Sequence, residues 1–476
     1  VSGVAIFVVA GFILNMQRIS KSMLFGNSFS FTLSKNMYSV YLRSELYEAR
    51  KHKKEDVVSS ITHHSEKIGQ EYFGNQLLTF LFSLLLTTGL MITLLVINPW
   101  YGMLTLFALP IYYFLTTQVS KLVDRRNQRF LQSSKEHKDF LDESVDQLKN
   151  IKVLNGIDKQ EANHQDMLKR VDVLNRKKTW LEVVNNEFTS DLFIGLILVF
   201  MLGLGGVLVM STQDMTIGDL VASIIIISQI FISFRKVIDS NIMPRHIKED
   251  IEKVNLLLEL RMENRANTVQ QLDEIYSLKF KDVSFDYGPK TKFGLDDISF
   301  EVKKGEKLGI LGLSNSGKTT LFDLLTKVVR PKQGSVLINN ADMNKVNTYY
   351  LRELISAVPQ NYCLFTDTVE KNITYPLAFD EYQYNDALNK CRLKSLIYSL
   401  EKKDQTIISE NSTFLTEGDK QKIALANAIY KDAKIFILDE STSKMDQGIE
   451  SDIIDEIYKL KNKIIVVISN RIYNLL

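Results

Sequence analysis

The sequence contains few cysteines and carries little net charge, and each of these features excludes a class of protein. Its two cysteines are Cys363 and Cys391, so a disulfide scaffold and a zinc ribbon are excluded. The 58 basic and 56 acidic residues leave a net charge of only +2, without the basic excess that is typical of nucleic-acid-binding proteins. No histidine follows His246. The apolar content of 45% excludes disorder for most of the chain.

Uncharged apolar residues are concentrated in five stretches of the first half. They are Val1–Met16, Leu77–Ile97, Tyr101–Val119, Leu192–Met210 and Leu220–Phe234. A helix that crosses a bilayer needs about 20 mostly apolar residues, and three of the stretches reach that length directly. The alternative is a set of buried helices in a soluble core. Five such stretches in one chain favour membrane spans.

The loops between these stretches differ in their basic content. The two long loops are rich in Lys and Arg, whereas the short connections Asn98–Trp100 and Ser211–Thr216 contain neither. Basic residues favour the cytoplasmic side of a membrane, so the long loops are predicted to lie inside the cell. The pattern of segments such as Asp139–Ile157 predicts helices that continue well beyond the bilayer.

The composition changes after the last apolar stretch. Arg235–Arg261 continues it as a charged helical pattern, and 262–274 has the low apolar content of a linker. From Ile275 onward, short β-rich runs alternate with helical stretches, which indicates α/β architecture. We therefore predict a multidomain chain. An all-α transmembrane helical bundle over residues 1–261 is followed by the linker and by an α/β domain over 275–476.

One loop of the second half carries the main chemical signal. Gly312, Gly317 and Lys318-Thr319 fit G-x-x-x-x-G-K-[ST], between an apolar strand and an amphipathic helix. That context disfavours the alternative of an accidental match. Such a loop turns its backbone N–H groups toward phosphates, with Lys318 on the β- and γ-phosphates and the Thr319 hydroxyl on Mg²⁺. The predicted nucleotide contacts are Gly312, Leu313, Ser314, Asn315, Ser316, Gly317, Lys318, Thr319 and Thr320.

A second apolar strand ends in the pair Asp439-Glu440. In doubly wound sheets, ligands bind at the carboxyl ends of the strands. Asp439 is predicted to hold Mg²⁺, and Glu440 to orient or deprotonate an attacking water. Alone this motif is weak, and a solvated turn is the alternative. Downstream of a P-loop it becomes a strong signal.

With these motifs the chain resembles the ATP-binding cassette transporters, specifically exporters with fused membrane and nucleotide-binding domains. The resemblance implies that Tyr287 stacks on adenine and that Gln360 contacts Mg²⁺ and the membrane helices. Leu415–Asp419 occupies the place of the signature LSGGQ, with Thr416 and Gly418 left to face the nucleotide of a second subunit. Ser443–Asp446 resembles the D-loop SALD. Lys318, Gln360, Glu440 and Asn470 are the implied catalytic residues, and ATP and Mg²⁺ the implied cofactors.

The sequence departs from the family pattern at two places. Glu417 and Asp419 replace a Gly and the Gln of the signature, and these carboxylates are expected to repel a triphosphate. Asn470 stands where the family has its switch histidine, and an amide cannot carry a proton. We therefore expect weak hydrolysis. The first family span and the end of the nucleotide-binding domain are also expected to be missing from this chain.

The resulting hypothesis is ATP-driven export across the plasma membrane by one half of a dimeric transporter. The substrate is expected to be amphipathic or apolar, such as a peptide, lipid or drug, and the nucleotide-binding domain cytoplasmic. The expected partners are a second half-transporter, which makes a homo- or heterodimer, membrane lipids and the substrate, with no nucleic acid. An alternative is a regulatory subunit that binds ATP with negligible turnover. A soluble P-loop enzyme conflicts with the five apolar stretches.

Overall fold

The chain forms two compact units in the computed structural model. Val1–Tyr38 and Glu55–Leu258 make up the first, and Ser39–Lys54 and Glu259–Leu476 the second. The structure describes residues 2–187, 192–211, 216–263, 274–288, 294–313, 315–410 and 412–470. The predicted division at 1–261, 262–274 and 275–476 remains a prediction. The short segment Ser39–Lys54, which follows the first apolar helix, folds with the second unit.

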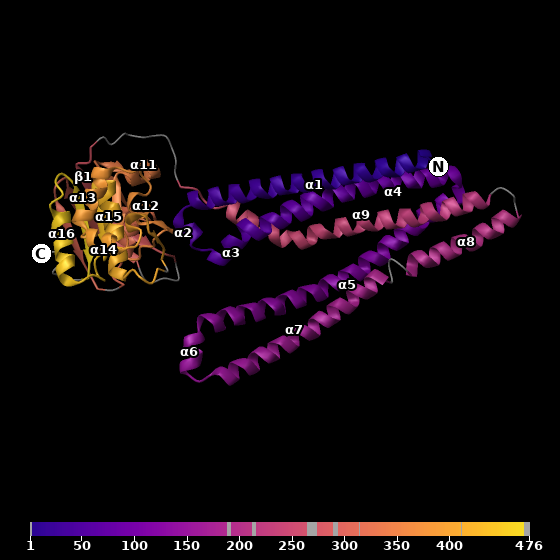
Figure 1. The fold of residues 1–476 in the computed structure, drawn as a ribbon, viewed down its shortest axis with the longest axis horizontal. Coiled ribbons are helices and arrows are strands. Elements are labelled where there is room, and N and C mark those ends of the chain that lie inside the picture. Colours follow the sequence, from indigo (N-terminus) through magenta and orange to yellow (C-terminus); the bar gives the residue numbers. More distant parts are fainter. Residues whose placement is uncertain are drawn as a thin grey trace. The chain divides into compact units, whose positions relative to one another are not determined.

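The described part of the first unit consists of helices joined by short connections (Figure 1). The helices are α1 (Ser2–Arg43), α3 (Lys54–Ser59), η1 (Ser60–His64), η2 (Lys67–Gln76), α4 (Leu77–Ile97), α5 (Pro99–Asp146), α6 (Leu148–Val153), α7 (Ile157–Asn186), α8 (Phe193–Ser211) and α9 (Ile217–Leu258). The end of α1, from Ser39, belongs to the second unit.

Over their described residues, the five apolar stretches predicted from the sequence fall in the helices α1, α4, α5, α8 and α9, except that Leu192 lies directly before α8. Within the described residues, three helical segments are long and apolar enough to cross a membrane: Lys54–Ile97, Pro99–Asp146 and Ile217–Ser240. The apolar part of α8 is shorter, at Phe193–Val207. Within α1, the side chains of residues 2–12 and 14 lie outside the described set.

A small aromatic core holds the apolar helices together. The ring of Tyr112 on α5 is fully buried and lies 5.4 Å from Phe231 of α9 and 5.3 Å from Phe193 of α8. The hydroxyl of Tyr101 donates a hydrogen bond of 2.8 Å to the carbonyl oxygen of Met201. Around this core, large apolar side chains such as that of Phe107 point outward. An exposed apolar surface over the length of a helix is what contact with lipid tails permits.

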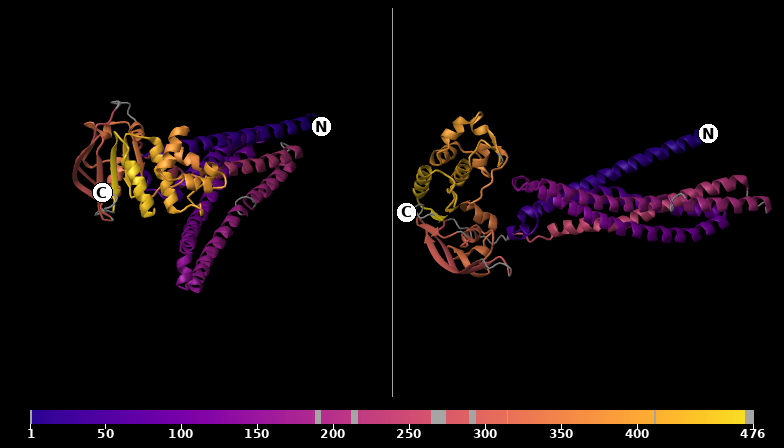
Figure 2. Two further views of the ribbon diagram at one scale, coloured as in Figure 1. Left: turned by 60° about the vertical axis from the view of Figure 1, so that its left-hand side comes forward. Right: turned by 90° about the horizontal axis from the view of Figure 1, so that it is seen from below.

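Helices α5 and α7 extend far beyond the apolar stretches. They contain 48 and 30 residues, lie side by side, and are joined at one end by the short helix α6 (Figures 1 and 2). The polar face of this pair includes ion pairs along one helix, such as Arg176–Asp172 at 2.9 Å. This arrangement agrees with the sequence pattern, which predicts helices that continue out of the bilayer.

The second unit contains two main sheets. An antiparallel sheet has the order β2-β1-β4-β5, a parallel sheet has the order β3-β10-β9-β6, and a small sheet pairs β7 with β8. The strands are β1 (Ser277–Asp286), β2 (Gly294–Lys303), β3 (Lys307–Leu311), β4 (Gln333–Ile338), β5 (Ala341–Asp342), β6 (Ile355–Val358), β7 (Asp367–Thr368), β8 (Ile407–Ile408), β9 (Ile435–Asp439) and β10 (Ile464–Ser469).

Helices alternate with these strands along the chain and complete the α/β architecture that the sequence predicts (Figures 1 and 2). They are α2 (Leu46–Ala49), α10 (Lys318–Leu325), η4 (Met343–Lys345), α11 (Thr348–Glu353), α12 (Val369–Thr374), α13 (Glu381–Lys390), α14 (Lys394–Ser399), η5 (Lys403–Gln405), α15 (Glu417–Lys431) and α16 (Gln447–Tyr458). Every residue of β9 and of β10 is buried. Because both faces of a central parallel strand are buried, its sequence is a nearly continuous apolar run.

Candidate nucleotide-binding site

Each of the four strands of the parallel sheet is followed closely by residues that the sequence marks as functional. Leu311 of β3 pairs with Ser469 of β10, and Asp439 of β9 pairs with Ile468. Strand β6 ends at Val358, opposite Leu438. The P-loop, Gln360, Glu440 and Asn470 therefore follow neighbouring strand ends at one edge of the sheet. This is the edge where parallel α/β sheets bind ligands.

The loop after β3 curls so that Lys318 points back into it. Gly317 precedes α10 with φ of +91°, a left-handed conformation that glycine adopts without strain. The Lys318 ammonium donates to the carbonyl oxygens of Gly312 at 2.7 Å and of Leu313 at 2.9 Å. It also pairs with Glu440 at 3.1 Å, and both side chains are about nine-tenths buried. The loop thus places a cation and the N-terminus of α10 together.

Glu440 joins the loop to a third element. Gln360 donates a hydrogen bond of 2.8 Å from Nε2 to Oε2 of Glu440. The backbone of Glu440 has φ of +47° and its N–H bonds the carbonyl of Ile468 at 2.9 Å. An unusual backbone angle that the neighbouring strand fixes is common at functional positions. Lys318, Gln360 and Glu440, three of the four predicted catalytic residues, are therefore in direct contact.

Asp439 is a buried carboxylate next to this cluster. Only 2% of the surface of this residue is exposed to solvent. Burial, reinforced by the negative charge of Glu440, raises the pKa of Asp439 to about 6, although the Lys318 ammonium acts in the opposite direction. A buried acid with a raised pKa at a strand end is typical of a site that gains a cation.

The residues at this edge fit a magnesium ion that is shared with phosphates. The carboxylate of Asp439, the amide oxygen of Gln360 and the hydroxyl of Thr319 are hard oxygen donors, which Mg²⁺ prefers. In the described part of the chain, no group of three or more His, Cys, Asp and Glu side chains could hold a metal alone. Magnesium commonly binds one or two protein oxygens together with substrate phosphates and water. The predicted set Thr319, Gln360 and Asp439 is of that kind.

Tyr287, predicted to stack on adenine, lies beside the helix that follows the P-loop. Its hydroxyl is 3.2 Å from Oγ1 of Thr320. Its carbonyl accepts a 2.9 Å hydrogen bond from the hydroxyl of Tyr47 on α2. Arg50, from the same segment as Tyr47, lies 3.8 Å from the buried carboxylate of Asp323 on α10. No local sequence pattern indicates these contacts of Ser39–Lys54, because the residues that they join are 240 or more positions apart.

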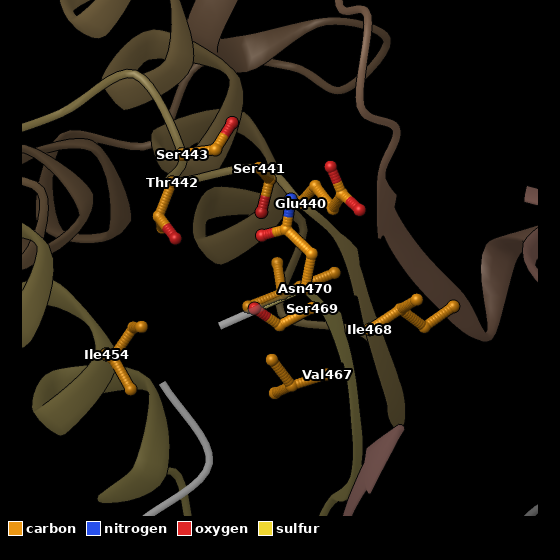
Figure 3. A pocket seen from close by; sticks show the side chains of 10 residues that line it. Glu440, Ser441, Thr442, Ser443, Ile454, Val467, Ile468, Ser469 and Asn470 are labelled. Carbon is orange, nitrogen blue, oxygen red and sulfur yellow. The ribbon is translucent and has the colours of Figure 1, made fainter. Parts of the chain in front are cut away.

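Asn470 lies with Glu440 around a small hollow beyond the ends of β9 and β10 (Figure 3). Ser441 lines the same hollow; it is 2% exposed, and its hydroxyl has no hydrogen-bond partner among the described residues. Asn470 thus lies near Glu440 at the end of β10, and its place as the switch residue remains a prediction. Ser441 is not among the residues predicted from the sequence, although its hydroxyl directly follows the Asp-Glu pair.

The predicted signature residues lie at the start of α15. Thr416 caps this helix, because its Oγ1 accepts from the N–H of Asp419 at 3.1 Å and donates to Oδ2 of Asp419 at 2.6 Å. Asp419 also pairs with Lys422 at 3.1 Å. Burial acts to raise the pKa of Asp419, but the hydrogen bonds from Thr416 and Lys422 outweigh it and hold the pKa below its ordinary value.

Lysines also surround Glu417, at the first position of α15. Lys444 lies 2.8 Å from Oε2 of Glu417, and Lys420 lies 2.9 Å from Oε1. Hydrogen bonds from Lys444 and Lys420 lower the pKa of Glu417 to about 2. The sequence predicts that Glu417 and Asp419 repel a triphosphate. It does not show the lysines that pair with them in the structure, which are Lys420, Lys422 and Lys444.

Two family models match the chain and together span most of it. The model described as "ABC transporter transmembrane region" matches residues 1–234, and the model "ABC transporter" matches residues 295–443. The second match contains the P-loop, Gln360 and the Asp-Glu pair. The chain belongs to the ABC transporter family. It is a multi-pass membrane protein with a helical transmembrane region followed by an α/β ABC nucleotide-binding domain.

Curated ABC transporters from several organisms resemble this one. The "ATP-dependent lipid A-core flippase" of Paraburkholderia xenovorans (strain LB400) is 28% identical over 372 residues, which cover 76% of this chain and 61% of the flippase. The "Lactococcin transport/processing ATP-binding protein LcnC-like" of Lactococcus lactis subsp. lactis (strain IL1403) is 27% identical over 398 residues, 82% of this chain and 54% of that protein. The chain thus spans about 61% or less of these relatives' lengths.

A solved structure supports the fold of this ABC transporter over nearly its whole length. The structure, "Structure of a bacterial Atm1-family ABC exporter with ATP bound", aligns with a TM-score of 0.82 and 21% sequence identity. The alignment covers 94% of this chain and 80% of that one.

The structure places most of the predicted nucleotide contacts on two elements. Gly312, Leu313, Asn315, Ser316 and Gly317 form the loop between β3 and α10, and Ser314 lies outside the described residues. Lys318, Thr319 and Thr320 open α10. Thr416 and Gly418 stand apart from this loop, at the start of α15, where their neighbours are Asp419 and Lys444. Their role in nucleotide binding remains a prediction.

Proposed function

We propose that this ABC transporter exports an amphipathic or apolar substrate at the expense of ATP, as one half of a dimer. The observation that carries the proposal is the contact of Lys318 with Glu440 and of Glu440 with Gln360 at one sheet edge. A lysine for phosphates and a carboxylate for the attacking water are the two groups that phosphoryl transfer to water requires.

Each residue of the site has a defined part in this proposal. The loop N–H groups and Lys318 hold the phosphates, with Mg²⁺ between them and the donor set of Thr319, Gln360 and Asp439. Glu440 orients the attacking water or accepts its proton, and Gln360 holds one oxygen of that carboxylate. Tyr287 stacks on the adenine. Thr416 and Gly418 face the nucleotide of the second half-transporter.

The rate of hydrolysis is proposed to be low but measurable. Lys318, Asp439 and Glu440 are all present and close together, which supports turnover. Asn470, which we take as the counterpart of the switch residue, cannot relay a proton, because an amide does not titrate. Positioned proton transfer contributes about 10²- to 10⁴-fold to enzymatic rates, so a defect in one of several participating groups slows the reaction without abolishing it.

The class of substrate follows from the spans and from the relatives. The predicted spans contain almost no charge, so a substrate that crosses among them is expected to be apolar or amphipathic. One curated relative is named a lipid A-core flippase and another a lactococcin transporter, which are consistent with a lipid or a peptide. The proposed location is the plasma membrane, with the nucleotide-binding domain in the cytoplasm.

A regulatory subunit that binds ATP with negligible turnover is the second candidate. The observation that favours it is Asn470 next to Glu440, since loss of the switch group affects hydrolysis more than binding. In this case a partner subunit would supply the turnover, and this chain would contribute nucleotide-dependent closure. A ligand that binds the closed state better than the open state is sufficient to drive such closure.

One experiment separates the two candidates. The transporter is reconstituted in lipid vesicles, and its ATPase rate is measured with and without lipid or peptide substrates for the wild type and for Glu440→Gln. Export predicts a low rate that substrate stimulates and that Glu440→Gln removes. Nucleotide binding with equal, negligible rates in both proteins would instead support the regulatory subunit.

A further inference from the structure

Lys444 is attached to the first turn of α15 in three independent ways. Its ammonium lies 2.8 Å from Oε2 of Glu417. Its backbone N–H donates a hydrogen bond of 3.0 Å to Oε1 of Gln421. Its carbonyl oxygen would lie 3.0 Å from a Cβ atom at position 418, so Gly418 allows the two backbones to approach closely. The segment after β9 and the start of α15 therefore behave as one structural element.

The charge at this place requires compensation. A helix N-terminus carries a partial positive charge that attracts anions. The carboxylate of Glu417 lies at that end of α15 and is about half exposed. Without a partner, it would offset the helix potential and repel a phosphate by Coulomb interaction. Lys444 supplies the opposite charge from a different part of the chain, 27 residues away.

We propose that Lys444 is a positioning residue for nucleotide binding: it neutralises Glu417 and so keeps the start of α15 compatible with a triphosphate held by the second half-transporter. The inference rests on the proposed function, because the start of α15 meets a nucleotide only in a dimer. Lys444 acts through Glu417 and through the backbone of Gly418, and it does not need to touch the nucleotide itself.

Lys420 also contacts Glu417, but it neutralises this carboxylate less fully than Lys444 does. Its ammonium contacts Glu417 at 2.9 Å, and it also bonds the carbonyl of Glu410 at 2.7 Å and the carboxylate of Glu410 at 3.4 Å. A second carboxylate therefore uses part of its charge. Lys444 has Glu417 as its ion-pair partner in the structure, so it is the residue whose removal exposes the carboxylate most directly.

The test is a double-mutant cycle on the assembled transporter that contains this full chain. Labelled ATP with Mg²⁺ is titrated against the wild type, Lys444→Ala, Glu417→Gln and the double variant. We expect Lys444→Ala to weaken half-saturation by about 3- to 10-fold, in line with one exposed like-charge contact. Glu417→Gln should bind as well as the wild type or better. The double variant should regain the affinity of Glu417→Gln.

A purely structural role of Lys444 would give a different pattern. If Lys444 only held the backbone, or if it bound the phosphate itself, the loss would be the same in the Glu417→Gln background, and the inference would be overturned. The loss in Lys444→Ala should also shrink as salt is raised, because exposed charges are screened. Equal losses at low and high salt would contradict the inference.

A control variant and the wild type together distinguish a failure of this inference from a failure of the proposed function. Lys459→Ala removes a lysine from a similar 2.8 Å pair, with Glu456 on α16, and should leave ATP affinity unchanged. Retention of ATP by the wild type, with no dependence of the Lys444 effect on Glu417, refutes this inference alone. Absence of ATP binding by the wild type refutes the proposed function, and this inference with it.

Discussion

The P-loop end and the α15 end of the nucleotide-binding domain handle charge in opposite ways. At the P-loop, one cation is held by neutral carbonyls and by the carboxylate of Glu440. At the start of α15, Glu417 and Asp419, which the family resemblance predicts to replace signature residues, are each matched by lysines. The first end has the residue types of the G-x-x-x-x-G-K-[ST] motif. At the second end lysine partners offset both carboxylates, so an acidic residue at a motif position does not by itself mean a repulsive site.

The largest effect is expected from removing the cation of the P-loop end. Lys318→Ala should weaken retention of labelled ATP by about 10- to 100-fold, because hydrogen bonds to charged groups contribute about 1.5–3 kcal/mol. Photocrosslinking or filter binding on the assembled transporter measures this. The charge-conserving variant Lys318→Arg serves as the control for folding. Unchanged retention in Lys318→Ala would refute the assignment of the loop as a phosphate site.

The acidity of Asp439 provides a pH test of the same end. Burial raises the pKa of Asp439 to about 6, and Mg²⁺ needs the ionised carboxylate. Lowering the pH from 7 to 5 therefore moves the group from mostly ionised to mostly protonated, and Mg²⁺-dependent ATP retention should fall by about 10-fold.

The control for this test is Asp439→Asn, which should lose the Asp439 part of the pH dependence. Phosphates also titrate near pH 6, so the comparison of the two proteins isolates the carboxylate. No histidine follows His246 in the sequence, so residues 275–476 contain no imidazole that could titrate in this range. Identical pH profiles in both proteins would contradict the role of Asp439.

A proton-carrying side chain introduced beside Glu440 should raise the rate of ATP hydrolysis and leave ATP binding almost unchanged. Asn470→His is expected to raise the ATPase rate by about 10-fold, since an imidazole titrates in the physiological range and can relay a proton. ATP retention should change little. Asn470→Gln, which keeps the amide, is the matched control. A rate that stays at the wild-type level in Asn470→His would show that position 470 does not limit hydrolysis.

The smallest effect concerns the link between Tyr287 and α2. Tyr47→Phe removes the hydroxyl that donates to the carbonyl of Tyr287 at 2.9 Å. Loss of one neutral hydrogen bond is worth about 0.5–1.5 kcal/mol, so ATP affinity should fall by about 2- to 10-fold. A fluorescent adenine nucleotide reports this directly. Tyr398→Phe, an exposed tyrosine on α14, should have no effect; a matching loss there would rule out a specific link.

The sequence predicts those parts of the molecule whose signal is local. Each apolar stretch falls in a helix, because hydrophobic runs reflect lipid contact or burial. The P-loop and the Asp439-Glu440 pair were predicted because strand, loop and helix follow one another in the chain. Contacts between distant residues leave no such pattern. Examples are Tyr47 with Tyr287 and Glu417 with Lys444, which the fold brings together.

We infer that the P-loop end of this ABC transporter both binds ATP and slowly hydrolyses it. A single-turnover assay with ATP labelled at the γ-phosphate, preloaded on the assembled transporter, tests both parts at once. We expect slow release of labelled phosphate by the wild type and retention of intact ATP by Glu440→Gln. Equal release by the two proteins, or absence of bound ATP in both, would refute this inference.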